Sequence, residues 1–273
     1  MLKKIDCNNK ILKCREFESD LFLFNEYLNG LKNIDIYSDE KNYVCFYNEL
    51  NHNIYIWSLD NIDELIITEI EEVIGEILKN NDCRIICKKG LYNLLFKSDN
   101  INFNDDYNEI SYLKCEKVKK PKVCSGDIYI PSIYDVDLIS HYYYERNLEN
   151  NDFKSLDEVK KNVGNLIDQD NSNYSNSAIY GWKNGNNIIV SLAIYKSYFN
   201  YATINNVYTT IGNRNKGYAS NLLYYITKII LSEGMIPIVS FNNEYVNIYK
   251  NIGYINCGCI INTSCTLKNV KNR

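Results

Sequence analysis

The stretch between residues 201 and 233 constrains the fold more than any other part of the chain. Residues 201–209 are rich in β-branched and aromatic side chains, which predicts a strand. After a short turn, apolar residues recur at the i, i+3, i+4, i+7 spacing of one helix face: Ala219, Leu222, Leu223, Ile226, Ile229 and Ile230. The sequence therefore predicts a strand and an amphipathic helix joined by a short turn.

The turn carries the motif Arg-x-x-Gly-x-Ala, formed by Arg214, Gly217 and Ala219, at the point where the helix begins. A helix N-terminus presents unpaired N–H groups and a partial positive charge, so it attracts phosphate. Gly217 allows close backbone approach, and Arg214 and Lys216 add positive charge. An ordinary strand–helix–strand core explains the apolar spacing but not the basic turn. We therefore predict a pyrophosphate-binding turn.

The strand, the turn and the helix together resemble the acyl-CoA-binding motif of the GNAT acetyltransferase superfamily, whose pattern is Gln/Arg-x-x-Gly-x-Gly/Ala. A second block also resembles the family: a strand at 236–241, then Asn243, then Tyr249 followed by Gly253 and Tyr254. The two blocks cover about half of the region after Pro121. The resemblance implies an α/β protein (an α+β mixed sheet) with the GNAT-like acyl-CoA N-acyltransferase fold.

The resemblance also implies a site for acetyl-CoA. Backbone groups of Val207, Tyr208 and Thr209 would pair with the pantetheine arm like an added strand. The pyrophosphate would be held by the turn and the first helical residues: Arg214, Asn215, Lys216, Gly217, Tyr218, Ala219 and Ser220. Asn243 would contact the cofactor. Tyr249 would protonate the leaving thiolate, since a phenol is neutral at physiological pH and can donate.

The general base has no counterpart in this sequence. Many GNAT proteins carry a Glu late in the first of these strands, where this chain has Asn205 and Asn206. Three routes for removing the amine proton stay open: a water chain, Glu145 and His141.

The function that the resemblance implies is direct transfer of an acetyl group from acetyl-CoA to a primary amine. A non-catalytic acyl-CoA-binding or regulatory module is the alternative, favoured by the missing carboxylate. In a third interpretation, the first half recognises a protein or peptide acceptor while the second half performs the chemistry. The acceptor stays open among small amines, amino acids, antibiotics and protein N-termini.

The first half of the chain repeats the order of elements in the second. Strand, long helix, strand and short helix are predicted at 54–96 and again at 201–251. The long helix of the first copy, 61–79, starts at a cap on Asp60 or Asn61, and one stripe carries its apolar residues: Leu65, Ile66, Ile70, Val73, Ile74 and Ile77. Asp60 and Asp63 stand where the second copy has its basic turn and would repel phosphate. We therefore predict tandem GNAT-like domains, the first degenerate and without cofactor.

Three further local predictions concern the first half and the domain boundaries. Apolar residues at roughly helical spacing predict a helix within 11–30, and His52 is predicted in an exposed turn. The basic, proline-containing segment around Pro121 predicts a linker at 119–125, which gives domains at 1–118 and 126–273.

The second half also has clear start and turn signals. Ser132 can cap a helix, and Ser155 with Glu158 predicts a capping box for the next one. A hairpin is predicted from 178–183 and 188–195 around Asn184 and Gly185.

The charge and composition of the chain limit the classes of partner that we expect it to bind. The net charge of −4 argues against nucleic acid as the main partner, and no apolar run approaches a membrane span. The N-terminus lacks the apolar core of a signal peptide, so we expect a cytoplasmic protein. The ten cysteines lack zinc-site spacing and are expected to be reduced core thiols. With only two histidines, no metal is expected.

Overall fold

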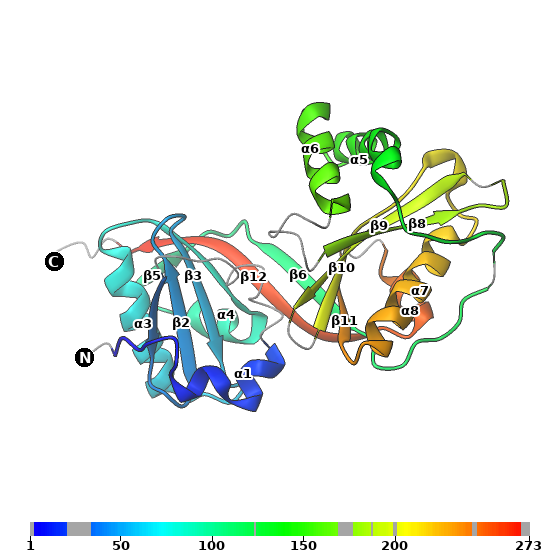
Figure 1. Ribbon diagram of the computed structural model, residues 1–273. Helices are drawn as coiled ribbons and strands as arrows, with labels where there is room; N and C mark the ends of the chain where they lie inside the picture. Colours follow the sequence, from blue (N-terminus) through cyan, green and yellow to red (C-terminus); the bar gives the residue numbers. More distant parts are fainter. Residues whose placement is uncertain are drawn as a thin grey trace. The chain divides into compact units, whose positions relative to one another are not determined.

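A computed structural model describes residues 3–20, 34–122, 124–168, 177–186, 188–198, 201–241 and 245–268 (Figure 1). The chain forms two compact units, one of Met1–Ser111 with Gly258–Arg273 and one of Tyr112–Cys257. The last strand thus groups with the first unit, and the expected linker at 119–125 lies inside the second. The domain boundaries at 118 and 126 stay a prediction.

The sheet of the first unit runs in the order β1-β2-β3-β4-β12, and β5 also pairs with β12. Its strands are β1 (Ile34–Ser38), β2 (Tyr43–Asn48), β3 (Asn53–Ser58), β4 (Cys83–Lys88), β5 (Ile101–Phe103) and β12 (Ile255–Leu267, of which 258–267 belong to this unit). The β3–β4 pair is parallel and the other pairs are antiparallel. His52, with φ of 53°, lies exposed in the β2–β3 turn, as predicted.

Helices cover both faces of this sheet. On one face lie α3 (Glu64–Leu78) and α4 (Lys89–Leu95), whose buried residues form one cluster with those of the strands. The predicted stripe of α3 is confirmed from Ile70 to Ile77, whereas Leu65 is exposed and lies outside it. On the other face, α1 (Arg15–Asp20) places Phe17 against Phe46 and Trp57.

Two predicted helix starts need correction. The N-cap of α3 is Asp63, whose carboxylate accepts the Ile66 N–H at 3.0 Å, and not Asp60 or Asn61. Asp60 instead forms an ion pair with Lys88 at 3.1 Å, so its carboxylate is directed to the neighbouring strand. Within 11–30, the short helix η1 (Lys10–Lys13) ends at an extended Cys14 before α1 begins, and residues 21–33 lie outside the described part.

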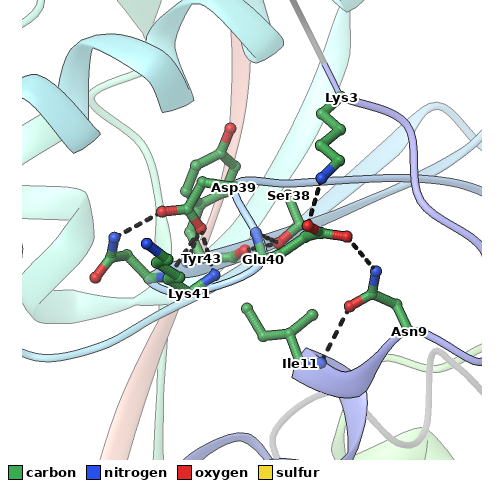
Figure 2. Close-up of polar contacts among 9 residues, drawn as sticks. Lys3, Asn9, Ile11, Ser38, Asp39, Glu40, Lys41 and Tyr43 are labelled. Carbon is green, nitrogen blue, oxygen red and sulfur yellow. Dashed lines mark hydrogen bonds and ion pairs between the residues drawn. The ribbon is translucent and has the colours of Figure 1, made fainter.

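The turn from β1 to β2 is held by a polar network (Figure 2). The carboxylate of Asp39 accepts from the backbone N–H groups of Lys41, Asn42 and Tyr43 at 2.8–3.2 Å. Glu40 forms an ion pair with Lys3 and accepts the Asn9 side-chain amide at 2.7 Å. The N-terminal segment is thereby attached to the edge of the sheet.

The sheet of the second unit runs in the order β6-β11-β10-β9-β8-β7. Its strands are β6 (Asn108–Lys114, of which 112–114 belong to this unit), β7 (Asp127–Tyr129), β8 (Ser177–Lys183), β9 (Ile189–Tyr198), β10 (Tyr201–Thr209) and β11 (Ile236–Phe241). The β10–β11 pair is parallel, and β7 to β10 pair antiparallel. The predicted hairpin is confirmed, with the Asn184 side chain accepting the Ile188 N–H at 3.1 Å.

Two pairs of helices pack on opposite sides of this sheet (Figure 1). One pair is α5 (Val136–Glu149) with α6 (Leu156–Ile167), and the other is α7 (Tyr218–Ser232) with α8 (Val246–Ile252). Ser155 caps α6 by accepting the Glu158 N–H at 3.2 Å, as half of the expected capping box. Before α5, Ser132 and Asp135 form a complete capping box.

Both units contain the same succession of elements, as predicted from the sequence. In the first unit it is β3, α3, β4 and α4, and in the second it is β10, α7, β11 and α8. In both, the two strands that flank the long helix pair in parallel. A right-handed helical crossover is the usual way to join such strands.

Within the second unit, the segment before Pro121 packs against the end of α8. Lys119 donates its N–H to the Ile252 carbonyl at 2.7 Å, directly before Gly253. Gly253 has φ of 107°, and a Cβ there would lie 2.5 Å from the Lys117 carbonyl oxygen. Only glycine fits this close approach, which explains the glycine that ends the second family-like block.

Candidate functional site

Strand β10 has a partner strand along most of one edge but along only part of the other. It pairs with β9 over 201–205 and again at Tyr208 and Thr209, but with β11 only from Tyr201 to Thr203. Between Asn205 and Tyr208 the register with β9 shifts, and Asn206 there has φ of 52°. Within the described part of the chain, the later half of β10 has no partner on its β11 side. Such an edge can take an extended ligand through main-chain hydrogen bonds.

The edge leads into the turn before α7. After the short helix η4 (Ile211–Asn213), α7 begins with Gly217 as its N-cap, and no side chain caps this end. The N–H groups of Tyr218, Ala219 and Ser220 have no partner among the described residues. An uncapped helix N-terminus of this kind is suited to binding an anion.

Gly217 is required by its backbone conformation. Its φ is 84°, a left-handed value that other residues rarely adopt. A Cβ at this position would meet only Asn221 and Cys124, at 3.8 and 3.9 Å. A Cβ would therefore fit with ordinary contacts, and the backbone conformation alone favours glycine here. Asn221 fixes the turn by donating from its side chain to the carbonyl oxygens of Gly217 and Lys122.

The two basic residues of the turn contact the protein itself. Nη2 of Arg214 lies 2.7 and 2.9 Å from the two carboxylate oxygens of Glu149 in α5, and Nε donates to the Thr209 carbonyl at 3.0 Å. Nζ of Lys216 donates to the Gly212 carbonyl at 2.9 Å. The positive charge of Arg214 is thus compensated by Glu149.

Tyr249 lies on α8 with 8% of its surface exposed. Its ring stands edge-on to that of Tyr254, with the centroids 5.9 Å apart. Burial raises the pKa of Tyr249, and the nearby positive charge of Arg146 partly opposes this rise. The phenol therefore keeps its proton at neutral pH, as a general acid must.

The two side chains considered as base are both on α5, in different surroundings. Glu145 accepts a hydrogen bond from the Tyr208 hydroxyl at 3.2 Å, so its carboxylate reaches β10. His141 is exposed, and its Nδ1 lies 2.7 Å from the carbonyl oxygen of Asp137 on the same helix. In β10 itself, the Asn205 side chain donates to Thr203 at 3.0 Å.

Sequence reasoning missed the part played by α5 at the turn. The contacts from Glu145 to Tyr208 and from Glu149 to Arg214 both come from its C-terminal half. The i, i+4 spacing of the two carboxylates was the signal in the sequence, because it puts them on one helix face. Nothing in the spacing says which strand that face meets.

The remaining predicted site residue, Asn243, lies outside the described residues.

In the first unit, the helix that corresponds to α7 is α3, and its N-terminus differs. The carboxylate of Asp63 occupies that end by accepting the Ile66 N–H. A second anion there would be repelled, and the absence of cofactor binding in the first copy stays a prediction.

All ten cysteines are free thiols, five of them buried. Across the described ranges, no three His, Cys, Asp or Glu side chains are grouped as metal ligands. No helix in the part of the chain that the structure describes is both long and apolar enough to cross a membrane.

Comparison with known proteins finds solved structures whose folds are similar to that of this chain. No family model and no curated protein sequence matches it. A GNAT-family acetyltransferase from Colwellia psychrerythraea is similar with a TM-score of 0.58 at 13% identity, over 97% of this chain and 99% of the other. A Drosophila protein is similar with a TM-score of 0.56 at 10% identity, over 98% of both chains.

A GCN5-related N-acetyltransferase from Kribbella flavida is also similar, with a TM-score of 0.51 at 10% identity, over 81% of this chain and 86% of the other. The likeness to the Colwellia and Drosophila structures includes both units. The chain therefore has the mixed α/β fold of GNAT acetyltransferases over nearly its whole length.

Proposed function

We propose that this GNAT-fold chain is an N-acetyltransferase that moves an acetyl group directly from acetyl-CoA to a primary amine. One observation carries the proposal: the half of β10 that has no partner on its β11 side runs straight into the uncapped N-terminus of α7. An edge that can pair with an extended arm therefore adjoins an end that attracts phosphate. Acetyl-CoA combines these two chemical features in one molecule.

The cofactor would be held mainly by backbone groups. The segment of Val207, Tyr208 and Thr209 would pair with the pantetheine arm through those main-chain groups that face away from β9, such as the Thr209 N–H. The pyrophosphate would lie at the turn and the start of α7, against Arg214, Asn215, Lys216, Gly217, Tyr218, Ala219 and Ser220. Asn243 would contact the cofactor beyond β11. No metal takes part in this proposal.

In the reaction, the amine nitrogen forms a bond to the acetyl carbon while the carbon–sulfur bond breaks. The amine loses a proton to a base, and the departing sulfur gains one from the hydroxyl of Tyr249, which then regains a proton from solvent. Burial keeps Tyr249 protonated until that step. Of the three routes for the amine proton, Glu145 has the support of a contact with β10, whereas His141 faces its own helix.

A second candidate function is a non-catalytic acyl-CoA-binding or regulatory module. It is favoured by Asn205 and Asn206, which replace a carboxylate in β10. In a further variant, the first unit recognises a peptide acceptor and the second unit performs the transfer. We place either activity in the cytoplasm, on the sequence grounds given above.

The test measures both acetyl-CoA binding and acetyl transfer with the full chain. Calorimetry with acetyl-CoA should show one site per chain, and a panel of small amines, amino acids, aminoglycosides and peptides should then reveal release of free thiol. Binding without turnover on any acceptor would favour the module. Absence of binding, or two equivalent sites, would exclude the proposal.

A further inference from the structure

The ion pair between Arg214 and Glu149 stands at the predicted phosphate site. Nη2 of the arginine is 2.7 and 2.9 Å from the two oxygens of the carboxylate. Nε of the same guanidinium donates to the Thr209 carbonyl at 3.0 Å, which fixes the arginine stem to the end of β10. Both side chains remain partly accessible, with exposures of 41% and 38%, so an entering anion can reach the pair.

The Thr209 contact lies on the edge of β10 that turns away from β9. The N–H of Thr210 donates to Val190 of β9, and the main-chain groups of successive strand residues alternate in direction. The Thr209 carbonyl therefore points away from β9, and Arg214 meets it there. This places Arg214 at the junction of the open strand edge and the helix N-terminus.

The charges around this junction cancel. Arg214 and Lys216 provide two positive charges, and Glu145 and Glu149 of α5 provide two negative ones. The Arg214 guanidinium also lies 5.6 Å from the ring centroid of Tyr208, whose hydroxyl donates to Glu145. A diphosphate entering the turn would therefore find backbone N–H groups but no surplus of positive side chains.

We propose that Glu149 competes with the cofactor's diphosphate for Arg214, so that cofactor binding breaks this ion pair. The proposal rests on acetyl-CoA being the ligand, as inferred above. Phosphate groups bind a guanidinium through two parallel hydrogen bonds and carry more charge than one carboxylate, so the exchange of partners is favourable. Only ion pairs and hydrogen bonds change in this step.

The exchange would couple the cofactor to the acceptor side. Glu149 and Glu145 lie one turn apart on α5, so the exchange leaves an unpaired negative charge one turn from the candidate base. Because coupling between two ligands is reciprocal, a positively charged acceptor that is attracted by this charge will also tighten acetyl-CoA binding.

The experiment measures acetyl-CoA affinity by calorimetry in low salt for the full chain and its Glu149→Gln variant. We expect the variant to bind about 1.5-fold to fivefold more tightly, the scale set by an exposed ion pair. Glu145→Gln is the matched control, because it removes the same charge one helical turn away. It should change the affinity by less than Glu149→Gln does. S-acetylpantetheine, which lacks the diphosphate, should bind both proteins equally.

A double-mutant cycle completes the test. Arg214→Gln should weaken binding little in the natural chain, where Glu149 holds the arginine, but should abolish the gain in the Glu149→Gln background. Unchanged or weaker binding by Glu149→Gln overturns the proposal, as does an equal gain for Glu145→Gln or for S-acetylpantetheine. If neither the natural chain nor the variant binds acetyl-CoA, the proposed function itself fails.

Discussion

Tyr208 of β10 donates its hydroxyl hydrogen to the carboxylate of Glu145 across 3.2 Å, although 63 residues separate the two in the chain. Burial, followed by the charges of Glu149 and Glu145, raises the pKa of Tyr208 to about 12. The phenol therefore remains the donor at neutral pH, and Glu145 remains the acceptor. Through this pair, α5 brings a carboxylate to a strand that carries Asn205 and Asn206 but no carboxylate of its own.

The first prediction concerns this carboxylate as base. Glu145→Gln should lower kcat/KM for an amine acceptor by about 10²-fold, because positioned proton transfer contributes on that order. Acetyl-CoA affinity should change far less than turnover. Steady-state kinetics on the best acceptor of the amine panel would measure the loss.

His141→Gln is the matched control, since His141 lies one turn away on the same helix and is exposed. Its rate should stay near that of the natural chain. A large loss in His141→Gln together with a normal rate in Glu145→Gln would transfer the role of base to the histidine. Normal rates in both variants would point to water.

The second prediction concerns the turn. Gly217→Val should weaken acetyl-CoA binding, because a branched side chain is strained at φ of 84° and adds bulk beside the helix N-terminus. Left-handed backbone costs a residue with a Cβ about 1–2 kcal/mol, so part of the effect will be a lower melting temperature. Calorimetry and thermal unfolding would separate the two contributions.

Gly212→Ala provides the comparison within the same turn. A Cβ at Gly212 meets nothing within 4 Å, and this glycine is absent from those with positive φ. We expect nearly natural affinity and stability for this variant. Equal affinity of Gly217→Val and Gly212→Ala would remove the turn from cofactor binding.

The third prediction concerns the candidate acid. Tyr249→Phe should lower turnover by about 10²–10⁴-fold while leaving acetyl-CoA affinity nearly intact. Its hydroxyl has no hydrogen-bond partner among the described residues, so its removal should change the melting temperature little. Stopped-flow detection of free thiol would measure the rate.

Tyr254→Phe tests the other ring of the same pair. The Tyr254 hydroxyl lies 2.7 Å from that of Thr227 in the core, so its loss should destabilise the fold by about 1 kcal/mol. Turnover per folded molecule should be unchanged. The assignment of Tyr249 fails if its variant keeps the full rate, or if it unfolds like a core substitution.

The fourth prediction concerns pH and stability in the first unit. Burial by itself would raise the pKa of Asp39, but the N–H donors of Asn42, Lys41 and Tyr43 lower it below its ordinary value of 3.8. Because the pKa of Asp39 is lower in the folded state than in the unfolded state, its ionised carboxylate stabilises the fold at pH values above the ordinary pKa. This stabilisation is lost as the pH falls through the folded-state pKa. Asp39→Asn should therefore be less stable than the natural chain at pH 7.

The stability gap should close as the pH falls below about 4. Urea unfolding of both proteins between pH 2 and 7 would measure it, with the exposed Asp105→Asn as the control. A gap that is independent of pH would show that the Asp39 charge contributes nothing to the turn.

Several elements could be predicted from the sequence because their signals are local. The apolar stripe of α7 is buried at Leu222, Leu223 and Ile226, and the hairpin forms around Asn184. The sequence predicts a start of α3 that is three residues too early, because several acidic residues near it can all cap a helix. Only the structure shows that Asp60 turns to Lys88 and leaves the cap to Asp63.

The sequence by itself determined the repeated strand–helix–strand–helix order, the glycine turn before α7 and the positions of Tyr249 and Gly253. These follow from spacing and residue type along a few turns of chain. Tertiary structure alone decided that 258–267 groups with the first unit and that Glu149 neutralises Arg214. It also decided that β10 leaves β11 after Thr203. Such contacts join residues tens of positions apart, and their geometry depends on how whole elements pack rather than on any local preference.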